Sequence, residues 1–318
     1  MFVGHRKGAG IAEADRAHEI VRFGAEPILA AAEHLRARAQ LDVDFQSDDR
    51  FPSRVDRNSD GARPGRALRY AHGRHYGRGI LQQASAVKSE SASVAFAVYR
   101  RQPVWAAFLG VAPQEGEAGP EDALRVLAEQ VPAAAAVAPA WLRQRHGTDV
   151  LRATRPGPTG DGDALIVREP GVAATVFVAD CVPVLIAAGD LVAAVHAGWR
   201  GLASGVLASA VHELSRAPFR DGLSAEAWIG PAIGPCCYEV GEDVAVQVEA
   251  RSGPEVVTRR PGRKPHLDLP LAASRQLAGL GVAPVSALER CVRCSPDWWS
   301  YRRDGARAGR NYAFIWRD

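Results

Sequence analysis

Apolar residues gather in the last two thirds of the chain, where they form short runs separated by Gly, Asp and Pro. Four of these runs follow one another closely: DALIV, ATVFVA, PVLIAA and LVAAVHA. Short runs of this composition between turn residues are typical of strands. Because polar residues hardly interrupt them, both faces of these strands should be buried. The pattern therefore predicts a sheet that is covered on both sides.

Further elements are predicted on either side of these runs. SVAFAVYR, PVWAAFLGV and AWLRQRHGTDVLRA read as extended, and PEDALRVLAEQV carries Pro120 and two acids where a helix would begin. Helical spacing of apolar residues returns over 202–216. A last helix is predicted after Asp268 as its N-cap, ending before Gly281. One face of this helix would carry Leu269, Ala273, Leu277 and Leu280.

The first ninety-two residues have a different amino-acid composition. Residues 12–40 are rich in Ala, Glu, Arg and Leu and favour a helix. Residues 42–92 are poor in aliphatic residues, so they cannot bury enough apolar surface to offset the cost of ordering. We predict a partly disordered N-terminal extension over 1–92 and one α/β domain with a mixed sheet over 93–318. A second folded domain is the alternative for the extension.

Composition narrows the class of protein. No run of about 18 apolar residues is present, and the start lacks the apolar core of a secretory signal, so we expect no membrane span. Five cysteines in such a chain favour reduced thiols and a cytoplasmic location. Residues 1–90 hold 15 Lys+Arg against 12 Asp+Glu, whereas the remainder holds 24 of each. A neutral domain lacks the electrostatic footprint of a nucleic-acid partner.

Candidate chemistry lies where the predicted strands end. Cys181 follows one apolar run, His196 closes another, and His146 ends an extended run. Binding groups of α/β sheets gather at such edges. Two imidazoles and one thiolate with an open fourth position could form a catalytic zinc site, where bound water has a pKa of about 7. A buried thiol beside a structural histidine, or a Cys181 nucleophile with His196 as its base, are the alternatives.

The remaining cysteines offer a second metal-binding pattern. Cys236 and Cys237 are adjacent, and Cys291 and Cys294 form a C-x-x-C pair. Together they could make a four-cysteine zinc site. Neighbouring cysteines seldom both reach one tetrahedral ion, however, so the sequence alone disfavours this site.

Seven segments form an ordered and specific set of motifs. They are RQRHGTDV, GDALIV, VFVADCVPVLI, VAAVHAGWRGLASGV, WIGPAIGPCCYEVGEDV, HLDLPLAASRQLAGLGV and CVRCSPDWWSYRRDGARAGRNYAFIW. This set, over about residues 139–318, resembles the YfiH or laccase-domain family, once labelled multicopper polyphenol oxidases and now regarded as zinc-dependent purine nucleoside phosphorylases. The resemblance implies a layered α/β/β/α domain with a mixed sheet, similar to the catalytic domain of a bacterial deamidating toxin.

The resemblance also implies an activity and a metal. The family carries out phosphorolysis of adenosine, inosine, guanosine and methylthioadenosine, and deamination of adenosine. His146, Cys181 and His196 match the histidine and cysteine positions of its motifs and would hold zinc. Copper is less suited, because a multicopper centre needs many imidazoles and residues 93–318 hold four histidines.

The other site residues are assigned by chemistry. Asp180, or Asp163, would move a proton during deamination. Arg200, in the glycine-flanked turn that opens a helix, would bind phosphate. Arg302 would be a further anion contact, as would Arg303 unless it pairs with Asp304. Tyr238 would line the purine pocket.

One segment departs from the family. Its members usually open with an R-x-G-G-x-S segment whose arginine lies near the site, and here Arg100 or Arg101 are imperfect substitutes. Two alternatives therefore stay open beside the phosphorylase. One is a metal-independent thiol hydrolase similar to a deamidase, and the other is a nucleoside-binding protein without turnover.

Overall fold

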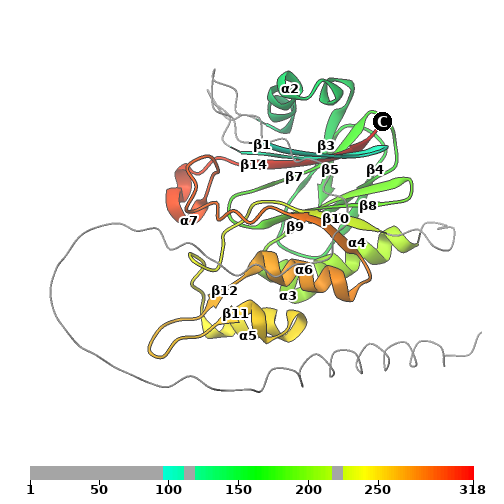
Figure 1. Ribbon diagram of the computed structural model, residues 1–318. Coiled ribbons are helices and arrows are strands. Elements are labelled where there is room, and N and C mark those ends of the chain that lie inside the picture. The colour runs from blue at the N-terminus through cyan, green and yellow to red at the C-terminus, as the bar shows by residue number, and fades with distance from the viewer. Residues whose placement is uncertain (1–95, 111–118, 217–224) are drawn as a thin grey trace, which may run out of the picture. The chain divides into compact units, whose positions relative to one another are not determined.

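The computed structural model describes residues 96–110, 119–216 and 225–318 (Figure 1). The extension predicted over 1–92, its helix at 12–40 and the domain boundary lie outside the described residues. Within the described part, the strands form two six-stranded sheets, which match the two β layers of the arrangement that the resemblance implies. Both are mixed sheets, since each contains parallel and antiparallel pairs.

The first sheet carries the start and the end of the described chain. In spatial order it contains β1 (Phe96–Arg101), β2 (Val104–Leu109), β14 (Asn311–Arg317), β7 (Val172–Val178), β3 (Ala138–Arg143) and β5 (Gly157–Asp161). Strand β3 runs parallel to its neighbours β5 and β7, while β14 runs antiparallel to β2 and β7. The last strand therefore joins the β1–β2 hairpin to the centre of the sheet.

The second sheet holds three of the four apolar runs. In spatial order it contains β13 (Ala283–Ala287), β10 (Glu226–Ile229), β8 (Val182–Ala188), β9 (Leu191–Ala197), β6 (Ala164–Val167) and β4 (Val150–Ala153). Strands β7 and β14 of the first sheet contact β9 of the second, so the sheets pack face to face. All four predicted runs are strands, and their side chains form the core between and around the two sheets.

Helices cover the two outer faces (Figure 1). Helix α2 (Pro120–Gln130) packs on the first sheet, where Leu124 and Leu127 belong to one buried cluster with Leu109 and Phe314. The second sheet is covered by α4 (Val206–Ser215) and α6 (Leu269–Gly279), and α3 (Trp199–Ser204) lies beside them. This gives the layered α/β/β/α arrangement that the sequence motifs imply.

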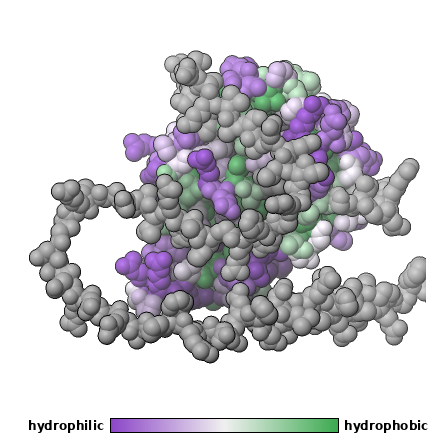
Figure 2. Space-filling view, viewed as in Figure 1, coloured by the Kyte–Doolittle hydropathy of each residue, from purple (hydrophilic) through white to green (hydrophobic). Residues whose placement is uncertain are grey.

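Short elements complete the chain. Helix α5 (Glu242–Ser252) packs on α3 and α6, and α7 (Tyr301–Asp304) follows the loop after β13. The remaining elements are η1 (Pro132–Ala136), η2 (Pro254–Val256), η3 (Gly305–Arg307) and the small sheet of β11 (Val257–Thr258) and β12 (His266–Leu267). The visible surface over α5 and β11–β12 is hydrophilic (Figure 2). None of the described helices is long and apolar enough to cross a membrane.

The helices after β9 differ in detail from the prediction. The segment over 202–216 is two helices, because Gly205 has a φ of 95° and ends α3 in the left-handed region. The predicted cap of α6 is confirmed, since the Asp268 carboxylate accepts a hydrogen bond of 2.9 Å from the Leu271 N–H. Leu280 lies at the C-cap of α6 and is 37% exposed, so it does not belong to the buried face.

Candidate active site

Three side chains that could hold a metal ion meet at one end of the two sheets. His146 lies in the loop after β3, Cys181 directly precedes β8, and His196 lies near the end of β9, paired with Pro183. Their ligand atoms all lie within 4.8 Å of one another. His196 is 3% exposed, Cys181 is half-buried and His146 is exposed. The group therefore has a buried side and an open side.

The backbone is bent sharply at two positions of this site. Among the described residues other than glycine, His146 and Asp180 have a positive φ, 61° and 92°. Short polar side chains and histidine tolerate this region better than other residues, but it still costs energy. Three consecutive N–H groups, from Arg145 to Gly147, donate to the Asp163 carboxylate at 2.7–3.2 Å. These hydrogen bonds hold the His146 turn in place.

Asp163 joins the two histidines. Its side chain is fully buried, and its Oδ1 lies 2.7 Å from His196 Nδ1. A carboxylate accepts, so His196 donates from Nδ1 and leaves Nε2 to face Cys181 and any bound ion. Burial raises the pKa of Asp163, but hydrogen bonds from His196 and Gly147 outweigh it and lower that pKa overall. Each Asp163 oxygen accepts two hydrogen bonds, so Asp163 is placed to orient His146 and His196 and has no free lone pair for the proton transfer considered for it from sequence.

Cys181 and His196 shift the pKa of one another. Burial raises the pKa of Cys181, but hydrogen bonds from His146 and His196 lower it to about 7. Burial lowers the pKa of His196, but Asp163 and Cys181 raise it to about 9. The thiolate, which is the form that binds metals, is thus accessible at neutral pH. Two imidazoles and one thiolate fit a soft or borderline ion such as zinc, and they do not fit calcium or magnesium.

A glycine that sequence reasoning did not single out allows this close approach. A Cβ atom at Gly198 would meet Cys181 Sγ at 3.0 Å and His146 Cδ2 at 3.1 Å. Such contacts are tighter than side chains normally make, so a larger residue would displace a ligand. The signal in the sequence was the glycine directly after the HA pair of HAGWRG.

Asp180 lies beside the ligands and holds the turn that opens α7. Its Oδ1 accepts from Ser300 Oγ at 2.6 Å and its Oδ2 accepts from the Arg302 N–H at 2.7 Å. Ser300, which is fully buried, was not foreseen from the sequence. These two hydrogen bonds give Asp180 a positioning role, and the proton transfer predicted for it stays a prediction.

Tyr238 and two arginines lie near the open side. The Arg302 guanidinium lies 5.1 Å from the Tyr238 ring centroid and donates to the Glu239 carbonyl at 3.1 Å. Arg200 is exposed and stacks on Trp199, with its guanidinium carbon 4.4 Å from the ring centroid. Burial raises the pKa of Tyr238 to about 12, and the charges of Cys181, Arg302, Asp180 and Arg200 all act on its phenol. These charged groups therefore lie near the Tyr238 phenol.

Three other arginines lie elsewhere or have partners. Arg101 pairs with Glu226, which is aligned with Ala187, about 20 Å along β8 from Cys181 at ~3.3 Å per residue. Arg100 pairs with Asp318 at that same far end. Neither is placed to replace the missing R-x-G-G-x-S arginine. Arg303 pairs with Asp304, as the sequence allowed.

The four remaining cysteines come together, contrary to the expectation from their spacing. Their sulfur atoms also lie within 4.8 Å of one another. Cys236 and Cys237 lie in a turn, where the Cys237 N–H donates to the Gly234 carbonyl at 3.0 Å. Consecutive side chains alternate along a strand but not in such a turn, so both thiols can face the C-x-x-C pair.

Known proteins are similar to this chain in sequence and in fold. The profile of a family described as multi-copper polyphenol oxidoreductase laccase matches residues 113–318. "Purine nucleoside phosphorylase YfiH" of Escherichia coli (strain K12) is 40% identical over 185 residues, covering 56% of this chain and 73% of the relative. A Deinococcus radiodurans protein named "Purine nucleoside phosphorylase" is 39% identical over 178 residues, covering 55% and 69%.

Solved structures are also similar to this chain in fold. A crystal structure of a Neisseria meningitidis protein has a TM-score of 0.58 and 30% sequence identity, covering 70% of this chain and 99% of its own. YlmD of Geobacillus stearothermophilus has a TM-score of 0.63 and 27% identity, covering 74% and 99%. By its motifs, its fold and these matches, the chain belongs to the YfiH or laccase-like family.

Proposed function

We propose that this protein is a zinc-dependent purine nucleoside phosphorylase that also deaminates adenosine. The observation that carries the proposal is the His146–Cys181–His196 group, in which His146 is exposed and Cys181 lies near Tyr238. Relatives named purine nucleoside phosphorylase support the reaction class. A zinc ion held by these three groups would supply a Lewis acid with an open coordination position.

The residues around the metal ligands suit a nucleoside. The phenol of Tyr238 stays protonated at neutral pH and offers both an aromatic face and a hydrogen-bond donor to a purine. In phosphorolysis a phosphate oxygen bonds to C1′ of the ribose while the bond from C1′ to the purine nitrogen breaks. The dianion needs positive charge, and Arg200 and Arg302 supply it at the open side.

Deamination needs the same purine in the same place. Water adds to C6 of adenosine and ammonia leaves, so inosine is the product. Asp180 contributes by holding the Ser300–Arg302 turn against the site. His196 keeps Nε2 toward the reaction centre because Asp163 occupies Nδ1.

The test is incubation of purified protein with adenosine, with and without phosphate, followed by chromatography and metal analysis. We expect the Cys181→Ala variant to carry about one zinc ion fewer than the wild type and to form neither adenine nor inosine. We also expect adenine in the wild type only when phosphate is present. His146→Ala should behave like Cys181→Ala, and His212→Ala, which removes an exposed histidine of α4, is the matched control. A fully active, zinc-free Cys181→Ala protein would contradict the proposal.

A metal-independent thiol hydrolase is the second candidate. The hydrogen-bonded Cys181–His196 pair, with a Cys181 pKa of about 7, is the observation that favours it. Such an enzyme keeps its activity after chelation and loses it on alkylation of Cys181. Loss of activity on chelation that zinc restores would instead favour the phosphorylase.

A further inference from the structure

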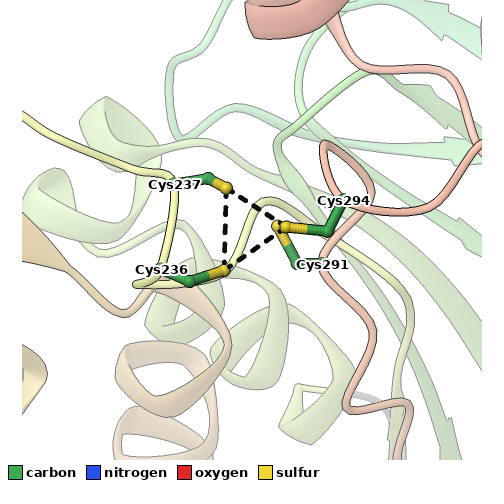
Figure 3. Close-up of side chains that lie close together, drawn as sticks. All are labelled: Cys236, Cys237, Cys291 and Cys294. Atoms are coloured by element: carbon green, nitrogen blue, oxygen red, sulfur yellow. Dashed lines mark hydrogen bonds between the residues drawn. The ribbon is translucent and has the colours of Figure 1, made fainter. Parts of the chain in front are cut away.

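Four thiols converge about one point outside the His146–Cys181–His196 group (Figure 3). Cys236 and Cys237 come from the loop between β10 and α5, and Cys291 and Cys294 come from the loop after β13. The two pairs are more than fifty residues apart in sequence, yet their side chains point toward one another. All five cysteines of the chain are free thiols, so no disulfide explains this convergence.

The spacing of the sulfur atoms fits a single tetrahedral ion. The distance from Cys236 Sγ to Cys237 Sγ is 3.7 Å, and Cys294 Sγ lies 3.8 Å from the former and 3.3 Å from the latter. Zinc binds thiolates at about 2.3 Å, which places the corners of a tetrahedron roughly 3.8 Å apart. A disulfide needs about 2.05 Å. An iron–sulfur cluster divides four thiolates between two or four irons, so the four sulfurs do not surround a single ion.

The backbone of both loops is shaped around this point. The Cys294 and Ser295 N–H groups both donate to the Cys291 carbonyl at 3.1 Å, which folds the C-x-x-C pair into a tight turn. Gly234 gives the opposite wall, since a Cβ atom there would meet Cys291 Cβ at 3.2 Å and Cys236 Sγ at 3.5 Å. Thiols are weak hydrogen-bond donors and acceptors, so four of them gain little from one another. A ligand explains the arrangement better than packing does.

We propose that Cys236, Cys237, Cys291 and Cys294 bind one zinc ion as a structural site, separate from the catalytic group. Four thiolates select a soft or borderline ion, and four protein ligands leave no open position for catalysis. The Arg293 guanidinium lies beside Cys237 and offsets part of the negative charge that four thiolates bring.

This ion would join the two loops that form the substrate side of the active site. Tyr238 directly follows Cys237. The loop after Cys294 is held by Arg303, whose Nη1 donates to the Val292 and Ser295 carbonyls at 2.9 and 2.8 Å. Arg302 precedes Arg303 and stacks on Tyr238. The second zinc therefore fixes Tyr238 and Arg302 relative to one another.

The first experiment counts metal ions in protein purified under reducing conditions. We expect two zinc ions per chain in the wild type and one in the double variant Cys291→Ser, Cys294→Ser. Cys181→Ser should also carry one, and the two losses should add in the combined variant. Asp297→Ser, an exposed residue of the same loop, is the control and should keep both ions. One zinc in the wild type, lost entirely in Cys181→Ser, would overturn the proposal.

A second measurement decides the matter if the cysteine variants do not fold. X-ray absorption at the zinc edge of the wild type counts sulfur ligands directly. Two sites place five thiolates on two ions, whereas the catalytic site alone places one thiolate on one ion. A spectrum with one sulfur per zinc, or a mass two hydrogens lower from a disulfide among the four thiols, would refute the second site. Neither readout requires turnover, so the four-thiol site is tested independently of the proposed phosphorylase activity.

Discussion

Asp163→Asn tests whether Asp163 positions the proposed metal ligands, because the variant leaves His146, Cys181 and His196 unchanged. The Asp163 carboxylate accepts four N–H groups, two at each oxygen. Asparagine keeps the shape but has one accepting oxygen, so its NH₂ group must face two donors. If the NH₂ group turns toward His196, the Nδ1 proton is displaced to Nε2, which is the atom that should face the ion.

The expected loss of stability follows from the buried N–H donors that Asp163→Asn leaves without an acceptor. Each buried donor without a partner costs about 1–3 kcal/mol, and two of the four lose theirs. We therefore expect the free energy of unfolding to fall by about 4 kcal/mol, within the range of ~3–5 kcal/mol for breaking a buried ionic pair. Loss of an outer-shell partner lowers metal affinity by about 10–100-fold. That corresponds to about 1.4–2.8 kcal/mol of binding free energy.

Two assays check these values. Urea denaturation of chelator-treated protein measures stability, and competition with a coloured zinc chelator measures affinity. Asp161→Asn is the matched control, because Asp161 lies two residues away and forms surface pairs with Arg143 and Arg145. Exposed pairs contribute about 0–1 kcal/mol, so this variant should keep wild-type zinc affinity. Equal zinc affinity in Asp163→Asn and wild type would refute the positioning argument.

The same carboxylate predicts a pH dependence. Its pKa in the folded protein is below the ordinary value of 3.8. It therefore stabilises the fold above that pH, and the contribution is lost as pH falls through the folded pKa. Urea denaturation of chelator-treated protein below pH 4 should show a steeper loss of stability in the wild type than in Asp163→Asn. Parallel pH profiles for the two proteins would contradict it.

Three further predictions follow from single positions. Gly198→Ala should lower zinc affinity at least tenfold in a chelator competition, because its Cβ crowds Cys181 and His146, whereas Gly279→Ala, with nothing near its Cβ, should not. Tyr238→Phe should raise the KM for nucleosides severalfold and leave the pH profile of kcat unchanged below pH 9, since the phenol has a pKa of about 12; an altered profile would mean that the phenol titrates during turnover. Leu185→Ala, at a fully buried position of β8, should cost about 2–5 kcal/mol in urea unfolding, and a smaller loss would mean that the core closes around the cavity.

The sequence predicted those elements whose own residues carry the signal. The apolar runs of β6 to β9 and the capped helices α2 and α6 could be read locally. Strand β5 has the sequence GPTGD, without an apolar run, and is a strand only because it pairs with β3. Helix α5 buries few apolar residues and was likewise not predicted. Pairing with distant segments, which decides such elements, has no local signature.

The candidate site likewise contains residues that the local sequence could predict and residues whose roles depend on distant contacts. His146, Cys181 and His196 could be proposed because each stands at a strand end. The role of Asp163 could not, because its partner His196 is 33 residues away and the interaction depends on β6 pairing with β9. The cysteine spacing argued against convergence, yet the four thiols come together because the turn at Cys236 and Cys237 directs both thiols to one side.

The proposed metal ligands and the proposed nucleoside-binding residues are therefore held by different parts of the fold. His196 lies in β9, Cys181 and Asp163 directly precede β8 and β6, and hydrogen bonds to Asp163 hold the His146 turn, so paired strands position the proposed metal ligands before any ion binds. Tyr238 and Arg302 rest instead on two loops joined by hydrogen bonds and by the four thiols. Metal binding should therefore depend on the core, and nucleoside binding on the loops. A second zinc at the thiols gives those loops the rigidity that the strands give the catalytic ligands.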